Sequence, residues 1–147
     1  MKNLVVRTIT GVLFVAAVVV SFLDPVAMTA LFALVTGLTV WEFTGLVNER
    51  NGVSVNRFIT TVAATYFYFA MAGFSSGITP PTAFIPYVLT IVYLMVAELY
   101  AKHEDPINCW AYTMLAQLYI ALPLSLLNVL AFRMTESGMS FTSVLPL

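Results

Sequence analysis

Charged side chains are scarce in this sequence: Asp, Glu, Lys and Arg make up only 9% of the chain, whereas a typical soluble domain contains about 25%. The few charges stand in short gaps between uncharged segments, which cover residues 8–23, 25–41, 58–97 and 106–132. An Asp, Lys or Arg at the centre of a bilayer costs about 2.5–3.5 kcal/mol, while a Leu, Ile, Phe or Val returns about 0.3–0.6. Because the charges avoid the apolar segments so consistently, the sequence predicts an integral membrane protein.

Cysteine is nearly absent as well. The single Cys109 excludes an internal disulfide and any cysteine-based metal site, and it is most simply a free thiol near a helix start. The sequence also lacks a basic cluster of the kind that binds nucleic acid, so nucleic acid is not an expected partner. No nucleophile–base pair, phosphate-binding glycine loop or zinc spacing is present.

The hydrophobic pattern predicts an all-α, polytopic transmembrane helix bundle with about five spans. We expect these spans near residues 5–23, 26–46, 58–73, 82–100 and 107–132. Asp24-Pro25 predicts a tight turn between the first two, because proline cannot continue a helix and disfavours helical geometry before it. The uncharged segment 58–97 is about twice as long as one span requires, and the Gly-, Ser- and Pro-rich residues 73–81 divide it. Pro123 should kink the last helix.

The positions of Lys and Arg predict the orientation. If the N-terminus is cytoplasmic, five of the six basic residues lie inside and only Arg133 lies outside. The first and third loops contain no Lys or Arg. Since cytoplasmic loops are enriched in these residues, we expect the N-terminus in the cytoplasm.

Two carboxylates, Glu42 and Glu98, are candidates for function because each closes an apolar span on the predicted cytoplasmic side. They could hold a divalent cation for a phosphate-containing substrate. The simpler interpretation places both at headgroup level, where a carboxylate stays solvated. His103, in the charged loop 102–105, could likewise titrate or bind a metal, although a solvated loop histidine is the simpler interpretation.

The fifth predicted helix carries a narrow polar or small stripe with spacings of four, four, four and three residues, which places its members on one face. The members are Thr113, Gln117, Ala121, Ser125 and Asn128. Gln117, the largest of them, could line a polar cavity. The simpler interpretation is hydrogen bonding between helices, worth roughly 0.6–2 kcal/mol per side chain. Ala33 and Gly37, four residues apart, suggest a close helix contact.

Three segments resemble the bacterial phosphatidate cytidylyltransferases, also called CDP-diacylglycerol synthases. Residues 1–11 read MKNLVVRTITG, like the start of that family. Trp41-Glu42-Phe43 with Leu46 resembles the family's Trp-Glu followed shortly by Leu at the end of the second helix. Residues 118–130, reading LYIALPLSLLNVL, resemble its mid-chain helix.

This resemblance implies a multi-pass enzyme of the bacterial inner membrane that joins phosphatidate to CTP, giving CDP-diacylglycerol and pyrophosphate with Mg²⁺. Its partners would be membrane lipids, phosphatidate and CTP, and whether the chain forms a homodimer stays open. The family's C-terminal signature, with its Lys-Asp pair and Pro-Gly-His-Gly-Gly stretch, is missing here, as is its intramembrane Asp-Thr motif. No catalytic, metal-binding or cofactor-binding residue can therefore be transferred.

We therefore expect residues 1–147 to be the N-terminal transmembrane region of a longer enzyme, inactive alone, with a further helix beginning near residues 139–147. The alternative is a complete, non-enzymatic five-helix scaffold or transporter subunit. Nothing in the residues taken alone identifies a reaction.

Overall fold

The computed structural model describes residues 2–135 and 138–141. Its elements are, in chain order, α1 (Lys2–Ser21), α2 (Pro25–Val47), α3 (Arg57–Ser75), the 3-10 helix η1 (Pro81–Phe84), α4 (Ile85–Ala101), α5 (Pro106–Leu115), the π-helix η2 (Ala116–Ala121), α6 (Leu122–Ala131) and the strands β1 (Phe132–Thr135) and β2 (Gly138–Phe141).

Five helical segments are long and apolar enough to cross a membrane: Leu4–Ser21, Pro25–Val47, Arg57–Ser75, Pro81–Ala101 and Pro106–Ala131. Their ends lie within two residues of the spans predicted from the sequence. The prediction of an all-α, five-span transmembrane protein is confirmed.

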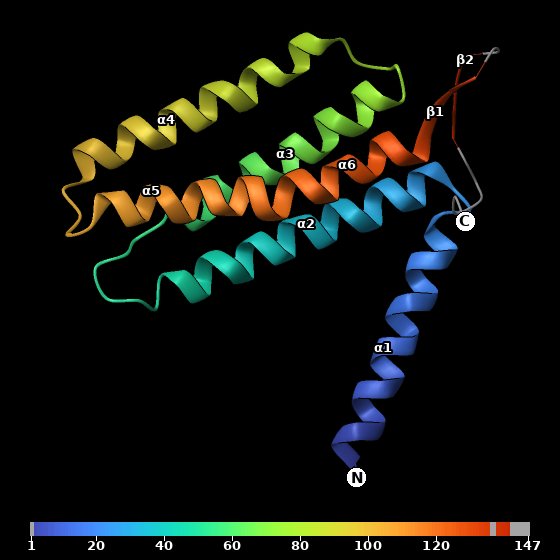
Figure 1. Cartoon of the computed structure of the whole chain (residues 1–147), viewed down its shortest axis with the longest axis horizontal. Helices are drawn as coiled ribbons and strands as arrows, with labels where there is room; N and C mark the ends of the chain where they lie inside the picture. The colour runs from blue at the N-terminus through green and yellow to red at the C-terminus, as the bar shows by residue number, and fades with distance from the viewer. Residues whose placement is uncertain (1, 136–137, 142–147) are drawn as a thin grey trace.

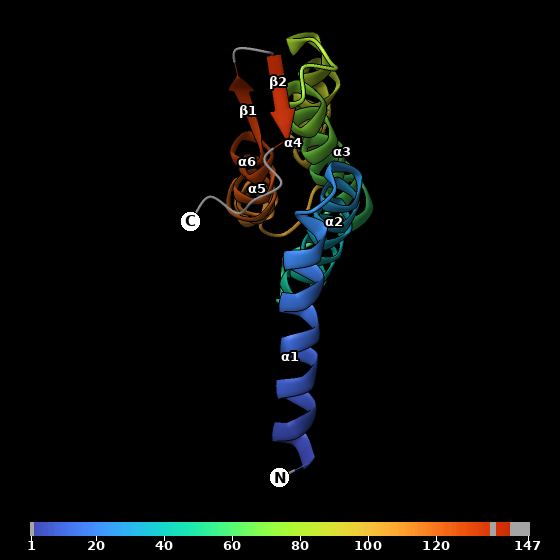
Figure 2. The same ribbon diagram turned by 90° about the vertical axis from the view of Figure 1, so that its right-hand side faces the viewer.

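The last four spans pack side by side, whereas α1 stands apart from them (Figures 1 and 2). Only 6% of the α1 span is buried, and its end meets the core through Val18. The hydroxyls of Thr8 and Thr10 bond carbonyls of their own helix. Lipid solvates apolar side chains as well as another helix would, so a helix needs small or polar contacts to dock in a membrane. Because α1 is little buried and its Thr hydroxyls bond only within the helix in the described structure, we describe the protein as a four-span bundle with α1 outside it.

Side-chain caps set the start of three spans. The carboxylate of Asp24 accepts from Ala27 N at 2.8 Å, with Pro25 as the first residue of α2. Asn56 caps α3 and Asp105 caps α5 in the same way, through Ile59 N and Asn108 N. Such caps satisfy backbone donors that a helix start leaves free, and the expected turn at Asp24-Pro25 is confirmed.

The bundle interior forms mainly between α2, α3 and the last span. One buried cluster centres on Met28, Phe32 and Tyr68, and a second on Val40, Ala64 and Phe67. The expected close contact at Ala33 and Gly37 is confirmed. Ala33 is buried, and a Cβ on Gly37 would lie 3.1 Å from Thr65 Oγ1 of α3.

A short antiparallel hairpin, β1–β2, follows the last span and was not expected from the sequence. It pairs Phe132 with Phe141, whose ring centroids are 5.5 Å apart. Both rings pack against the cluster around Met28. The expected helix start near residue 139 is therefore wrong for residues 139–141, because the chain turns back and packs Phe141, partly buried, against this cluster. Residues 142–147 lie outside the described part.

Candidate functional site

Two loops meet at the end of the bundle opposite the hairpin: the loop between α2 and α3 and the loop between α4 and α5 (Figure 1). The first is fixed by Asn48, whose side-chain amide bonds both the N–H and the carbonyl of Val55. The second lies against the first, because a Cβ on Gly52 would be 3.6 Å from Glu104 Oε2. This end gathers the charged and polar side chains considered below.

Glu98 and His103 form a hydrogen-bonded pair of carboxylate and imidazole at this end, with 2.6 Å between Oε1 and Nδ1. Glu98 lies in the last turn of α4 and His103 in the following loop. Their side chains are 12% and 32% exposed, so the histidine is partly enclosed rather than fully solvated. His103 lies in a loop, as the simpler interpretation expected, but its ring is held by the carboxylate of Glu98 instead of being fully solvated.

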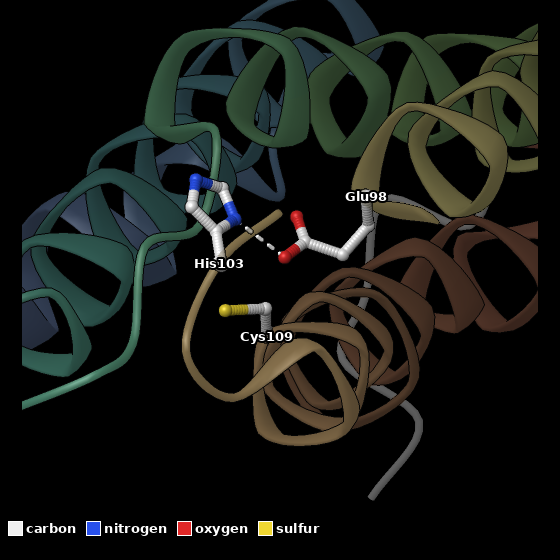
Figure 3. A group of neighbouring side chains, drawn as sticks. All are labelled: Glu98, His103 and Cys109. Carbon is white, nitrogen blue, oxygen red and sulfur yellow. Dashed lines mark hydrogen bonds and ion pairs between the residues drawn. The ribbon is translucent and has the colours of Figure 1, made fainter. Parts of the chain in front are cut away.

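Cys109, in the second turn of α5, faces the same pair (Figure 3). Its thiol is fully buried and accepts a hydrogen bond from Ser54 N at 3.2 Å. One ligand atom each from Glu98, His103 and Cys109 lies within 4.8 Å of the other two. The structure thus brings together a carboxylate, an imidazole and a thiol, the donor types from which protein sites for transition metals are built.

Lys102 joins α4 to this cluster in a strained conformation. Its φ of 50° lies in the left-handed region, where a side chain costs roughly 1–2 kcal/mol and where glycine is the usual residue after a helix. This backbone reversal directly precedes His103 and turns the chain back toward α4. The tight connection also brings the last turn of α4 beside the first turns of α5.

Arg57 and Arg50 bind aromatic side chains at the same end. The guanidinium of Arg57 lies 4.1 Å from the centre of the Trp41 ring, and its Nε donates to Trp41 O at 2.8 Å. A Cβ on Gly45 would lie 2.8 Å from the same guanidinium. Arg50 donates to Tyr112 Oη at 2.7 Å. The two cations are therefore held in defined places instead of extending freely into water.

Glu42 lies apart from the Glu98 group. It is exposed and borders an apolar groove of about 480 Å³ between α2 and the last span, lined also by Phe43, Leu46, Leu115 and Tyr119. Among the described residues that could jointly hold a metal, Glu98 is grouped with His103 and Cys109 and not with Glu42. The structure therefore does not bring the two predicted carboxylates together.

Gln117 is buried, with 1% of its surface exposed, and connects three helices. Its Nε2 donates to Thr60 O of α3 at 2.9 Å, and its Oε1 accepts from Tyr87 Oη of α4 at 3.3 Å. All five members of the polar or small stripe are buried. The interpretation of Gln117 as a hydrogen-bonding contact between helices is confirmed.

The polar or small stripe stays on one face of the last span because the helix is π-helical, not α-helical, at residues 116–121. In an α-helix each step of four residues rotates a side chain by about 40° beyond a full turn, so spacings of four would drift away from the interior. The π-helical turn Ala116–Ala121 is wider and reverses this drift. It ends two residues before Pro123, whose missing N–H already prevents regular bonding in that region.

The prediction that excluded any cysteine-based metal site did not foresee that Cys109 lies beside Glu98 and His103. The available signal was the short connection between two antiparallel helices, which places residues just before and just after it side by side. Comparison with protein-family models, curated proteins and solved structures finds no match to this chain.

Proposed function

We propose that this chain forms the N-terminal membrane region of a phosphatidate cytidylyltransferase-like enzyme of the bacterial inner membrane. The full enzyme would join phosphatidate to CTP, with release of pyrophosphate. The proposal starts from the resemblance of residues 1–11, 41–46 and 118–130 to that family. The chain's own task would be to hold the lipid substrate beside a catalytic part that these residues do not contain.

One observation in particular supports this proposal: Glu42 and Phe43 of the resembling segment border the apolar groove between α2 and the last span. A groove lined by Phe43, Leu46 and Leu115 suits an acyl chain. Arg57, stacked on Trp41, stands at the same end of α2. A guanidinium at headgroup level suits the phosphate of phosphatidate.

The group of three metal-ligating side chains found among the described residues does not suit the family's Mg²⁺. Mg²⁺ prefers oxygen ligands in octahedral geometry, whereas the group at Glu98 offers sulfur and nitrogen besides one carboxylate. Glu42 belongs to no such group among the described residues. In the proposed enzyme, the ligands for Mg²⁺ and the residues that bind CTP would come from outside this region.

A lipid-binding measurement tests the proposal. We expect the purified chain in nanodiscs to retain phosphatidate in preference to phosphatidylcholine, and Arg57→Gln to reduce that preference. Arg7→Gln, on the separate helix α1, is the matched control and should leave it unchanged. Equal retention of both lipids by the unaltered chain would contradict the proposal.

Two further results bear on the same proposal. The chain alone should make no CDP-diacylglycerol from CTP and phosphatidate, and turnover above background would show that the active site lies within it.

Reading the coding frame beyond codon 147 should reveal more hydrophobic spans that end in the Lys-Asp and Pro-Gly-His-Gly-Gly signature. A stop codon without a complementary frame nearby would favour the non-enzymatic scaffold.

A further inference from the structure

We infer that Glu98, His103 and Cys109 form a binding site for Zn²⁺ that fastens the connection between α4 and α5. Nothing in the proposed lipid-binding function requires this site, and it lies on different residues from the apolar groove at Glu42. The inference depends on the geometry of three side chains, on their donor chemistry and on their access to solvent.

The geometry requires only small shifts of the three side chains. In tetrahedral zinc sites the metal lies about 2.0–2.2 Å from nitrogen or oxygen and about 2.3 Å from sulfur, so that the ligand atoms are roughly 3.3–3.6 Å apart. The three ligand atoms all lie within 4.8 Å of one another. Glu98 Oε1 and His103 Nδ1, now 2.6 Å apart, would separate by about 0.7–1.0 Å to reach that spacing. A bound Zn²⁺ would take the place of the hydrogen between the carboxylate and the ring, and that proton would pass to Nε2 of the ring or to water. The metal would draw the thiol of Cys109 inward by a side-chain adjustment (Figure 3).

The donor set selects the class of metal. One thiolate, one imidazole and one carboxylate favour Zn²⁺ over Mg²⁺ or Ca²⁺, which take oxygen ligands. Binding would release the thiol proton of Cys109 to water. The two anionic ligands together would neutralise the charge of the metal. Three protein ligands leave a fourth position for water.

The surroundings of Cys109 suit a thiolate ligand. The N–H of Ser54 points at Sγ from 3.2 Å, and a charged acceptor strengthens such a bond. Because Ser54 belongs to the loop between α2 and α3, the site would also fix that loop. The side chain of His103 is 32% exposed, which provides an entry path for the metal that the buried thiol alone would lack.

The test titrates the metal-free full chain in detergent with Zn²⁺, and with Co²⁺ as a spectroscopic probe. We expect one Zn²⁺ per chain, no competition from excess Mg²⁺, and a near-ultraviolet charge-transfer band from sulfur to Co²⁺. Loss of groups that merely orient a ligand weakens metal sites about 10–100-fold, so loss of a ligand should cost at least about 100-fold. Cys109→Ser should therefore lose the band and bind Zn²⁺ at least about 100-fold more weakly. His103→Gln and Glu98→Gln should weaken binding similarly.

Glu49→Gln is the matched control, because Glu49 is an exposed carboxylate at the same end of the bundle and outside the group. Its affinity for Zn²⁺ should equal that of the unaltered chain. Zn²⁺ should also raise the melting temperature of the unaltered chain and of Glu49→Gln but not of Cys109→Ser. If Cys109→Ser fails to fold, His103→Gln, a change at a partly exposed loop position, decides by the same titration. Absence of stoichiometric Zn²⁺ binding, a Co²⁺ complex without the band, or undiminished binding by the folded variants would overturn the inference.

Discussion

Single polar side chains inside this bundle do most to specify how its helices meet. A hydrocarbon environment gives apolar helices little reason to prefer one another over lipid, so hydrogen bonds and close contacts between helices decide the packing. Gln117 makes two such bonds, one to α3 and one to α4. Trp110 adds another, from its Nε1 to Met95 O at 3.0 Å. These bonds connect the last span to α3 and α4.

Replacing Gln117 by Leu should destabilise the bundle by about 0.6–2 kcal/mol, because both bonds are lost while the volume is nearly kept. Tyr87→Phe removes only the bond to α4 and should cost less. In a double-mutant cycle the two changes should be non-additive, since they share that bond. The measurement is unfolding of the chain by SDS in mixed micelles.

Thr90→Val is the control for this series, because the hydroxyl of Thr90 bonds only Pro86 O of its own helix in the described structure. It should change stability little. A Gln117→Leu variant as stable as Thr90→Val would show that the buried amide does not hold the helices together.

At the scale of the helices, the sequence predicted those features that depend on the residues close to them along the chain. The five spans, the turn at Asp24-Pro25 and the inward face of the Gln117 stripe all follow from hydropathy, caps and spacing. The π-helical turn and the hairpin did not follow, because each depends on packing between distant segments: the stripe against α2 and α3, and Phe141 against the cluster around Met28. The separation of α1 likewise depends on which helices find polar or small partners.

The candidate site was only partly predictable for the same reason. Glu98 and His103 were recognised individually, but their pairing depends on the left-handed backbone at Lys102. Cys109 joins them because α5 begins directly after the short loop. The resulting group is local in space yet spread over a helix end, a loop and a helix start, and no single periodicity describes that combination.

The packing of α2 against α3 gives a prediction with an internal control. Gly37 faces Thr65 so closely that a Cβ would lie 3.1 Å from its hydroxyl, whereas a Cβ on Gly11 of α1 meets nothing within 4 Å. Gly37→Leu should therefore force the helices apart and destabilise the bundle by about 1–3 kcal/mol, the usual cost of overpacking. Gly11→Leu should have almost no effect in the same SDS titration. Equal effects of the two substitutions would show that α2 and α3 do not approach closely at Gly37.

For the whole molecule, the two ends of the bundle differ in charge. Arg50, Arg57 and Lys102 lie at or beside the two loops of one end, whereas the loops at the opposite end, 22–24 and 76–80, contain no Lys or Arg. Because Lys and Arg near the ends of spans favour the cytoplasmic side, we expect the end that carries Glu98, His103 and Cys109 to face the cytoplasm. The same orientation would place the proposed Zn²⁺ site in contact with the cytoplasm.

Reporter fusions test this orientation. A reporter fused after Gly52 or after Glu104 should show a cytoplasmic location, and one fused after Gly77 should show an external location. Gly52 and Gly77 both lie in turns with positive φ, so the fusions compare similar positions at opposite ends of the bundle. Replacing Arg50, Arg57 and Lys102 together by Gln should weaken the preference and give a mixed population, because it removes the charges that set it. An external reporter after Gly52 with a cytoplasmic one after Gly77 would reverse the topology, and the proposed Zn²⁺ site would then face the outside.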